Sequence, residues 1–317
     1  MSPSWTSRRF KWSTGLKGSI GIAVGRREVC AVHAVLGEKN THVQTIHSAQ
    51  LSDEMFAGPP TPAVETDLAS AFAKVAPEAK GKFIPCHVAL PDPTMRFTVF
   101  ELDELPKSEK ARLELVRWRF AKEHPAGDQT LACAYQGLGQ ENSKHLLLGQ
   151  AADNAWLQCI KQALRRAGIT PWSVNLGAGY RFNQFHDRFA KEKHGAAMVI
   201  LDPDSWSVFL WDAAARPRLA RARWRTGIDN GMEAYDMIAR EAERSILSYV
   251  RSGKNGSIAR VYAVGHAHEL DELAAALDRR LREKCIPLAA PCAIPDEDRK
   301  IQDHGLALLS LAASVAS

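Results

Sequence analysis

The sequence predicts an α/β protein of two lobes that share one order of strands and helices, with additional elements inserted into the first lobe. Three observations support this prediction. The chain opens on two short apolar strands joined by a tight turn. The order strand, strand, strand, helix, strand occurs twice along the chain. With 317 residues, of which 45% are hydrophobic, the chain also exceeds the size at which one core stops growing.

The opening hairpin spans residues 19–35 and turns at Gly25 and Arg26. Ile20 is followed by Gly21, and apolar and small residues then alternate up to the turn. One face of the hairpin can therefore be buried. The other face stays thin, in the sense that it carries only small side chains, and its glycines let a second group approach the backbone. A hairpin that binds phosphate needs such a thin face.

The rest of the first half alternates between strand and helix patterns. A third strand is expected at 41–48, a helix at 64–75 and a fourth strand at 83–90. The segment that follows combines three strands with two helices, the first capped by Ser108 and the second by Asp153. We predict that this segment is a strand-rich α+β subdomain inserted into the first lobe.

The second half repeats the pattern of the first. Strands are expected at 197–201, 206–211 and 219–224, followed by a helix and by another strand at 260–264. This duplicated order is typical of the actin-like, ribonuclease H-like fold, in which each half contributes a glycine-bearing hairpin to a shared nucleotide cleft. The predicted divisions are a basic tail at 1–17, the first lobe at 18–94, the insertion at 95–171, a linking helix of the first lobe at 172–195, the second lobe at 196–303 and a C-terminal helix at 304–317.

The composition of the chain argues against three classes of function: nucleic-acid binding, metal binding and membrane spanning. The net charge of +5 is diffuse, and no motif of alternating basic and aromatic residues accompanies it, so we expect no nucleic-acid partner. The six cysteines show no paired metal-ligand spacing, which indicates reduced core residues and no metal site. No run of about 18 apolar residues is present, so neither a membrane span nor a signal peptide is expected.

Several motifs in order along the chain carry a resemblance to a known family. They are Val88-Ala-Leu-Pro-Asp-Pro93, Glu114-Leu-Val-Arg-Trp118, Arg166-Ala-Gly-Ile-Thr-Pro171, Glu243-Arg-Ser245 and His304-Gly-Leu-Ala307. With these motifs the chain resembles the PilM family of type IV pilus assembly proteins, together with MshI of the mannose-sensitive haemagglutinin (MSHA) pilus and the cytoplasmic domain of GspL from type II secretion. The resemblance implies a cytoplasmic protein that docks the short cytoplasmic tail of a bitopic, PilN-like inner-membrane protein, with the assembly ATPase as a further candidate partner. The protein would then be peripheral to the inner membrane through that partner.

Active members of this family bind ATP through three motifs, and this chain departs from each. Ala23 stands where the family has an aspartate that holds a magnesium-bound water, and Asp202-Pro203-Asp204 stands where it has Asp-Ile-Gly. A like charge about 4 Å from a phosphate costs on the order of 4 kcal/mol at an effective dielectric of 20. Gly265-His266 replaces a Gly-Gly pair over which adenosine would lie. We therefore expect a pseudo-ATPase scaffold with no cofactor and no catalytic residues.

One alternative stays open at this point. Arg26 could bind phosphate without a metal, which would leave an ATP-binding protein whose nucleotide state regulates partner docking. A sugar or acyl kinase is a weaker alternative, because no aspartate is recognisable as a base for a substrate hydroxyl. The residues of the degenerate nucleotide cleft are Gly21, Gly25, Arg26, Asp202 and Gly265.

The resemblance also implies a partner groove between the first lobe and the insertion. The candidate partner-binding residues are Arg96, Arg117, Trp118 and Phe120. An indole flanked by arginine could receive an apolar or acidic residue of the partner. The alternative is that Trp118 fills the contact between a helix and a sheet.

Overall fold

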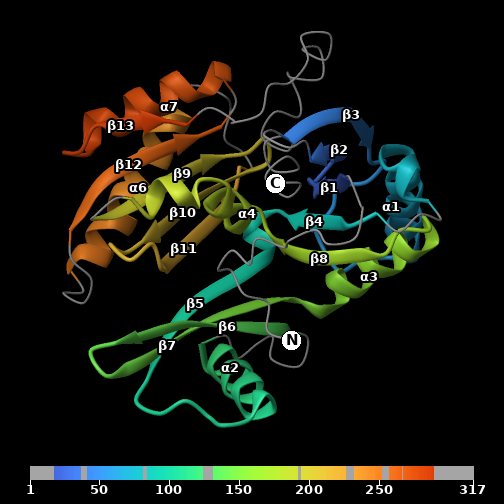
Figure 1. Cartoon of the computed structure of the whole chain (residues 1–317). Helices are drawn as coiled ribbons and strands as arrows, with labels where there is room; N and C mark the ends of the chain where they lie inside the picture. The colour runs from blue at the N-terminus through green and yellow to red at the C-terminus, as the bar shows by residue number, and fades with distance from the viewer. Residues whose placement is uncertain are drawn as a thin grey trace.

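The computed structural model describes residues 18–36, 41–80, 84–123, 131–191, 194–225, 232–251, 257–265 and 267–288. The expected tail at 1–17, the expected helix at 304–317 and His266 lie outside the described residues. Figure 1 shows two lobes side by side, each built on a twisted sheet, with a third group of strands below them. No helix within the described ranges is both long and apolar enough to cross a membrane.

The first lobe is a five-stranded sheet in the order β3-β2-β1-β4-β8, with two helices on one face. The strands β1, β2 and β3 are antiparallel neighbours, whereas β4 runs parallel to β1 and β8 parallel to β4. Helix α1 begins at Pro62, where the Thr61 side chain accepts a hydrogen bond from the Val64 amide at 3.3 Å. The elements are β1 (Gly18–Val24), β2 (Glu28–Leu36), β3 (Thr41–Gln50), α1 (Pro62–Val75), the short 3-10 helix η1 (Pro77–Ala79), β4 (Cys86–Leu90), α3 (Asn154–Arg166) and β8 (Pro171–Leu176).

The second lobe repeats this topology. Its sheet has the order β11-β10-β9-β12-β13, which is the first order with each strand replaced by its counterpart, and the parallel and antiparallel pairs also correspond. Helices α6 and α7 pack on one face of the sheet. The expected duplication is therefore confirmed. The elements are β9 (Gly195–Leu201), β10 (Ser205–Trp211), β11 (Pro217–Trp224), α6 (Met232–Arg251), β12 (Ile258–Val264), α7 (Ala267–Arg280) and β13 (Cys285–Pro287).

Helices α4 (Gly177–Gln184) and α5 (His186–Phe189) lie between the two sheets. Phe182 and Phe189 pack against the face of the second sheet that α6 and α7 leave open. Tyr180 packs against Ala23 and neighbouring residues on the inner face of the first sheet. The one long helix expected here is interrupted at Phe185, so that two shorter helices join the lobes.

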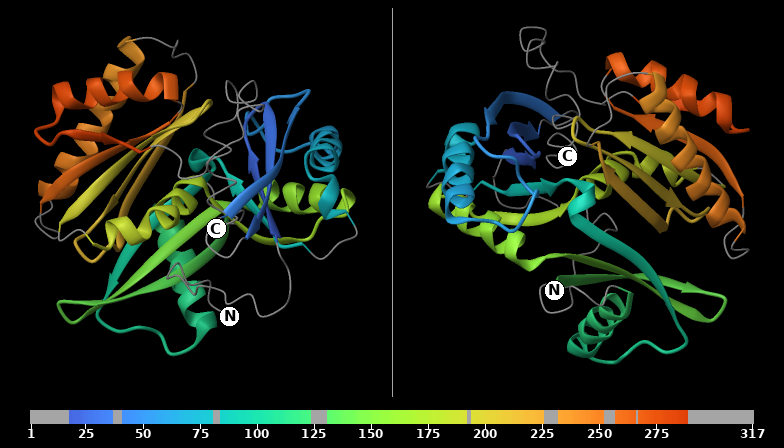
Figure 2. Two further views of the ribbon diagram at one scale, coloured as in Figure 1. Left: turned by 45° about the horizontal axis from the view of Figure 1, so that its top comes forward. Right: turned by 180° about the vertical axis from the view of Figure 1, so that it is seen from behind.

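The insertion is shorter than the expected range 95–171. It consists of β5 (Met95–Leu102), α2 (Glu109–Glu123), β6 (Leu131–Glu141) and β7 (Lys144–Asp153), preceded by the short 3-10 helix η2 (Asp92–Thr94). Its sheet has the order β5-β7-β6, and α2 covers one face. Figure 2 shows this layer projecting away from both lobes.

The remainder of the expected insertion belongs to the first lobe. Helix α3 begins where the Asp153 carboxylate accepts a hydrogen bond from the Ala155 amide at 2.8 Å, and its apolar face joins α1 in the first core. Gly168, with φ +77°, then ends the helix and turns the chain into β8. The expected linking helix at 172–195 therefore begins with a strand that completes the first sheet.

Candidate functional site

The turns of the two equivalent hairpins meet between the lobes. The Arg26 amide, in the β1–β2 turn, donates a hydrogen bond to Asp204 Oδ2, in the β9–β10 turn, at 2.8 Å. Gly25 lies so close that an added Cβ would be 3.2 Å from the same oxygen. The two turns face each other as expected, and the thin hairpin already holds an anionic group, which is the carboxylate of the other lobe.

The side chain of Arg26 is engaged as well. Its guanidinium forms an ion pair with Glu54 and lies over the ring of Trp224, 5.0 Å from the centroid. Glu54 follows β3 of the first lobe and Trp224 ends β11 of the second. A phosphate that approached Arg26 would have to compete with a carboxylate already in contact.

Asp202 is neutralised by a buried cation. The Arg181 side chain, fully buried on α4, forms a bidentate ion pair with the Asp202 carboxylate, and its Nη1 donates at 3.1 Å. Burial alone would lower the pKa of Arg181, but Asp202 outweighs this effect and raises that pKa above its ordinary value. The Asp202 carboxylate is therefore occupied by a guanidinium of the same chain.

Asp92, after β4, joins three parts of the molecule. Its carboxylate accepts hydrogen bonds from Ser207 Oγ of the second lobe at 2.7 Å and from the Ala178 amide of α4 at 2.8 Å. Burial and the nearby Asp202 raise the pKa of Asp92 to about 6, although Arg181 and the two hydrogen bonds act in the opposite direction. Asp92 therefore ties the lobes together with a carboxyl group that titrates close to neutrality.

The remaining cleft residues are packed. Gly21 is buried in β1 between Val32 and His87 of the neighbouring strands. Ala23 is fully buried in a small apolar cluster with Tyr180. An added Cβ at Gly265 would lie 3.2 Å from the Cβ of Leu201, so this glycine is required by the close approach of β12 to β9.

The four candidate partner residues do not form one surface. Phe120 is fully buried against Phe100 and belongs to the core of the insertion. Trp118 is 55% exposed, so the interpretation that it fills the contact between helix and sheet is wrong. Arg117 is exposed beside it on α2, and Arg96 is exposed on β5. Phe120 is therefore a structural residue, and only its exposed neighbours can meet a partner.

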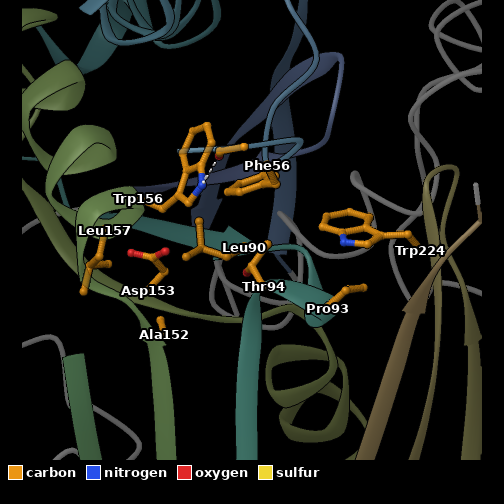
Figure 3. Close-up of a pocket in the computed structure, with 10 residues that line it drawn as sticks. Phe56, Leu90, Pro93, Thr94, Ala152, Asp153, Trp156, Leu157 and Trp224 are labelled. Atoms are coloured by element: carbon orange, nitrogen blue, oxygen red, sulfur yellow. Dashed lines mark hydrogen bonds between the residues drawn. The ribbon is translucent and has the colours of Figure 1, made fainter. Parts of the chain in front are cut away.

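A pocket of about 270 Å³ lies where the first lobe, the insertion and the second lobe meet. Figure 3 shows Phe56, Trp156 and Trp224 around it, one from each of three distant segments. The ring centroids of Phe56 and Trp156 are 4.7 Å apart, and those of Phe56 and Trp224 are 5.9 Å apart. Leu90, Thr94 and Asp153 also line the pocket.

Phe56, Trp156 and Trp224 form the aromatic wall of this pocket, and the backbone of Phe56 is strained. Phe56 has φ 63°, a backbone region that bulky residues rarely adopt. The Met55 amide donates to the Arg26 carbonyl at 2.7 Å, which ties this loop to the β1–β2 turn. The Trp156 Nε1–H donates to the Gly58 carbonyl at 3.0 Å and fixes the indole in the wall. The pocket is therefore coupled to the same hairpin that contacts Asp204.

The sequence analysis missed this pocket because its residues share no spacing. Sequence patterns place Trp224 at the end of a strand, Phe56 in a loop and Trp156 in a helix, with nothing to connect them. Among the described residues, no group of three or more His, Cys, Asp or Glu side chains is arranged to hold a metal ion. Asp202 was expected at the cleft, but no pattern in the sequence indicated that it pairs with Arg181.

These features define a two-lobed, actin-like protein whose hairpins contact each other directly. No protein-family model and no curated protein sequence matches the chain. Among solved structures it is similar to the PilM-PilN type IV pilus biogenesis complex, with a TM-score of 0.69 and 17% identity over 93% of this chain and 96% of that one. It is also similar to a Bacteroides thetaiotaomicron protein with an actin-like ATPase fold and unknown function, with a TM-score of 0.54 and 8% identity over 96% and 98% of the two chains.

A third similar structure is the cytoplasmic domain of EpsL, an inner membrane component of the type II secretion system of Vibrio cholerae, with a TM-score of 0.48 and 11% identity over 94% of each chain. The first two likenesses establish the actin-like fold. The resemblance to PilM expected from the sequence is thus confirmed at the level of the fold.

Proposed function

We propose that this chain is a non-catalytic, actin-like scaffold of a type IV pilus of the MSHA type, or of a related secretion assembly platform. In this role it docks the cytoplasmic tail of a PilN-like inner-membrane protein. The contact between Asp204 and the Arg26 amide carries the proposal, because a carboxylate occupies the donor that a nucleotide phosphate would need. The likeness to a PilM-PilN complex supports the assembly role.

The rest of the cleft supports the absence of catalysis. Magnesium would need an oxygen ligand at position 23, where an alanine is buried among apolar side chains. Arg181 already neutralises Asp202, and Glu54 neutralises Arg26. The alternative in which Arg26 holds a phosphate would require the loss of this ion pair and of its contact with Trp224.

The aromatic pocket is the docking site we propose for the partner tail. It lies where the first lobe and the insertion meet the second lobe, and an extended segment could place one apolar side chain in it against the aromatic rings. Strain at Phe56 is consistent with a site shaped for binding, since such strain collects at functional positions. Because Arg26 and Asp204 hold the lobes together without a nucleotide, docking would not depend on ATP.

The test is isothermal titration calorimetry with a synthetic peptide of the cytoplasmic tail of the PilN-like protein from the same genome. We expect the same dissociation constant with and without millimolar MgATP. In Thr94→Arg, whose longer side chain fills the pocket, the dissociation constant should rise about tenfold or more. Trp172→Ala is the matched control, because this exposed tryptophan does not line the pocket. Binding that requires MgATP would support the ATP-regulated alternative, and unchanged binding in Thr94→Arg would place the tail elsewhere.

A further inference from the structure

A second surface, separate from the pocket, lies on the outer side of α2. The inner side of this helix contributes Val116 and Phe120 to the core of the insertion. The outer side carries Trp118, which is 55% exposed and is not among the residues that line the pocket. Figure 1 shows α2 at the far side of the insertion sheet from both lobes.

Two cationic side chains lie over this indole. The Arg119 guanidinium lies 5.5 Å from the ring centroid of Trp118, and Lys122 Nζ lies 5.6 Å from it. Arg117 is a third, exposed cation of the same helix, and it lies toward Cys133 of β6 rather than over the ring. Weak cation–π attraction of this kind holds these cations beside the ring.

These three cations have no acidic partner within the described part of the chain. Two other exposed lysines of the insertion do have an acidic partner: Lys110 lies 4.0 Å from Glu114, and Lys144 lies 3.8 Å from Asp103. The Nε of Arg119 is buried and has no hydrogen-bond acceptor. Unpaired positive charge around a large exposed apolar ring is complementary to an acidic segment that also carries an apolar residue.

Two other occupants fit less well. The basic tail at 1–17 has the same sign of charge as this surface and would be repelled. An anionic membrane favours helices with a broad apolar face, whereas the other large apolar side chains of α2 point into the core. We therefore infer that the outer side of α2, centred on Trp118, Arg119 and Lys122, docks an acidic segment of a second protein partner.

The probe is a fluorescein-labelled peptide of sequence Glu-Asp-Glu-Phe-Asp-Glu, and binding to the full chain is measured by fluorescence anisotropy. We expect Trp118→Ala to weaken binding about tenfold, and Arg117→Glu and Lys122→Glu each to weaken it about threefold to tenfold. Raising the salt concentration should weaken binding of the unchanged protein, because the cations are exposed. The melting temperature should not change in these variants, since exposed side chains contribute little to folding.

Trp172→Ala is the matched control, because Trp172 is 49% exposed on β8 and should leave binding unchanged. The inference is overturned if the unchanged protein does not bind the peptide, or if Trp118→Ala and Trp172→Ala have the same effect. It is also overturned if vesicles of phosphatidylglycerol and phosphatidylcholine bind in a Trp118-dependent way while the peptide does not. Thr94→Arg should leave this binding intact, so a failure here is distinguishable from a failure of the pocket.

Discussion

Replacing Asp92 with asparagine should change how the stability of the protein depends on pH. In the folded protein burial raises the pKa of Asp92 from 3.8 to about 6. The folded state therefore binds a proton more tightly than the unfolded state, and ionisation of Asp92 lowers the free energy of unfolding as pH rises from about 4 to about 6. A difference of about 2 pKa units corresponds to about 3 kcal/mol.

The asparagine in Asp92→Asn would mimic the protonated carboxyl. Its side-chain oxygen can accept from the Ala178 amide, and its amide can donate to Ser207 Oγ, so both contacts of Asp92 persist. The assay is urea unfolding of both proteins from pH 4 to pH 8, with equal denaturant slopes as the check on two-state behaviour. We expect Asp92→Asn to gain about 3 kcal/mol relative to the unchanged protein between pH 4 and pH 8. A difference that is constant with pH, or that grows on acidification, would refute the reasoning.

Three further predictions concern stability. The pKa of His87 is lowered to about 4 by burial, so its contribution is present above about pH 6.5 and is lost as pH falls toward 4; the advantage of the unchanged protein over His87→Gln should shrink by about 3 kcal/mol over that range in urea unfolding. Phe120→Ala should cost about 3 to 5 kcal/mol, whereas Trp118→Ala should stay within about 0.5 kcal/mol, and equal losses of melting temperature would contradict the two assigned environments. Gly149→Ala should cost about 1 to 3 kcal/mol, because an added Cβ would lie 2.5 Å from Phe100 Cε2; an unchanged melting temperature would show that the rings can move.

The opposite signs of the first two effects explain why the variants are needed. Between pH 4 and pH 6 the unchanged protein loses stability through Asp92 and gains it through His87 as pH rises. A single unfolding curve of the unchanged protein would show the sum of the two. The variants separate them because neither asparagine nor glutamine titrates.

The duplicated fold could be predicted because its signals are local. Apolar alternation marks strands such as β9 and β10, helical spacing marks α1 and α6, and Asp153 and Gly168 mark the ends of α3. A repeat of such local signals is visible without any contact between the halves. The order of elements therefore identified the fold class.

The elements that were missed depend on contacts far apart in the sequence. β8 sits at an edge of its sheet, and the alternation of apolar and polar residues from Trp172 to Leu176 is short and runs directly into α4, so the helical pattern that follows obscures it. β6 extends beyond its apolar start, because the strand continues through a bulge at Gly137 and Gly139 up to Glu141. Glycine in a strand often marks such a bulge, and the sequence alone does not distinguish it from a turn.

The sequence predicted where the candidate site lies but not which residues contact each other within it. The hairpin turns at Gly25 and Asp204 were expected to face each other, and they do so. The contact between them, and the pairing of Asp202 with Arg181, join residues from different lobes or elements, and their distances follow only from the packing of α4 between the sheets. Substitutions in a motif indicate which groups are absent, whereas the contacts that the remaining residues make appear only in the structure.

We propose that Asp204 and its neighbours fill the place at which a nucleotide phosphate would bind. The most direct test is thermal unfolding of the unchanged protein with and without millimolar ATP and magnesium. A ligand that binds only the folded state at 100 times its dissociation constant adds about 2.7 kcal/mol, which is readily visible as a rise in melting temperature. We predict no rise for the unchanged protein, and a clear magnesium-dependent rise would contradict the claim that Asp204 and its neighbours have replaced the nucleotide.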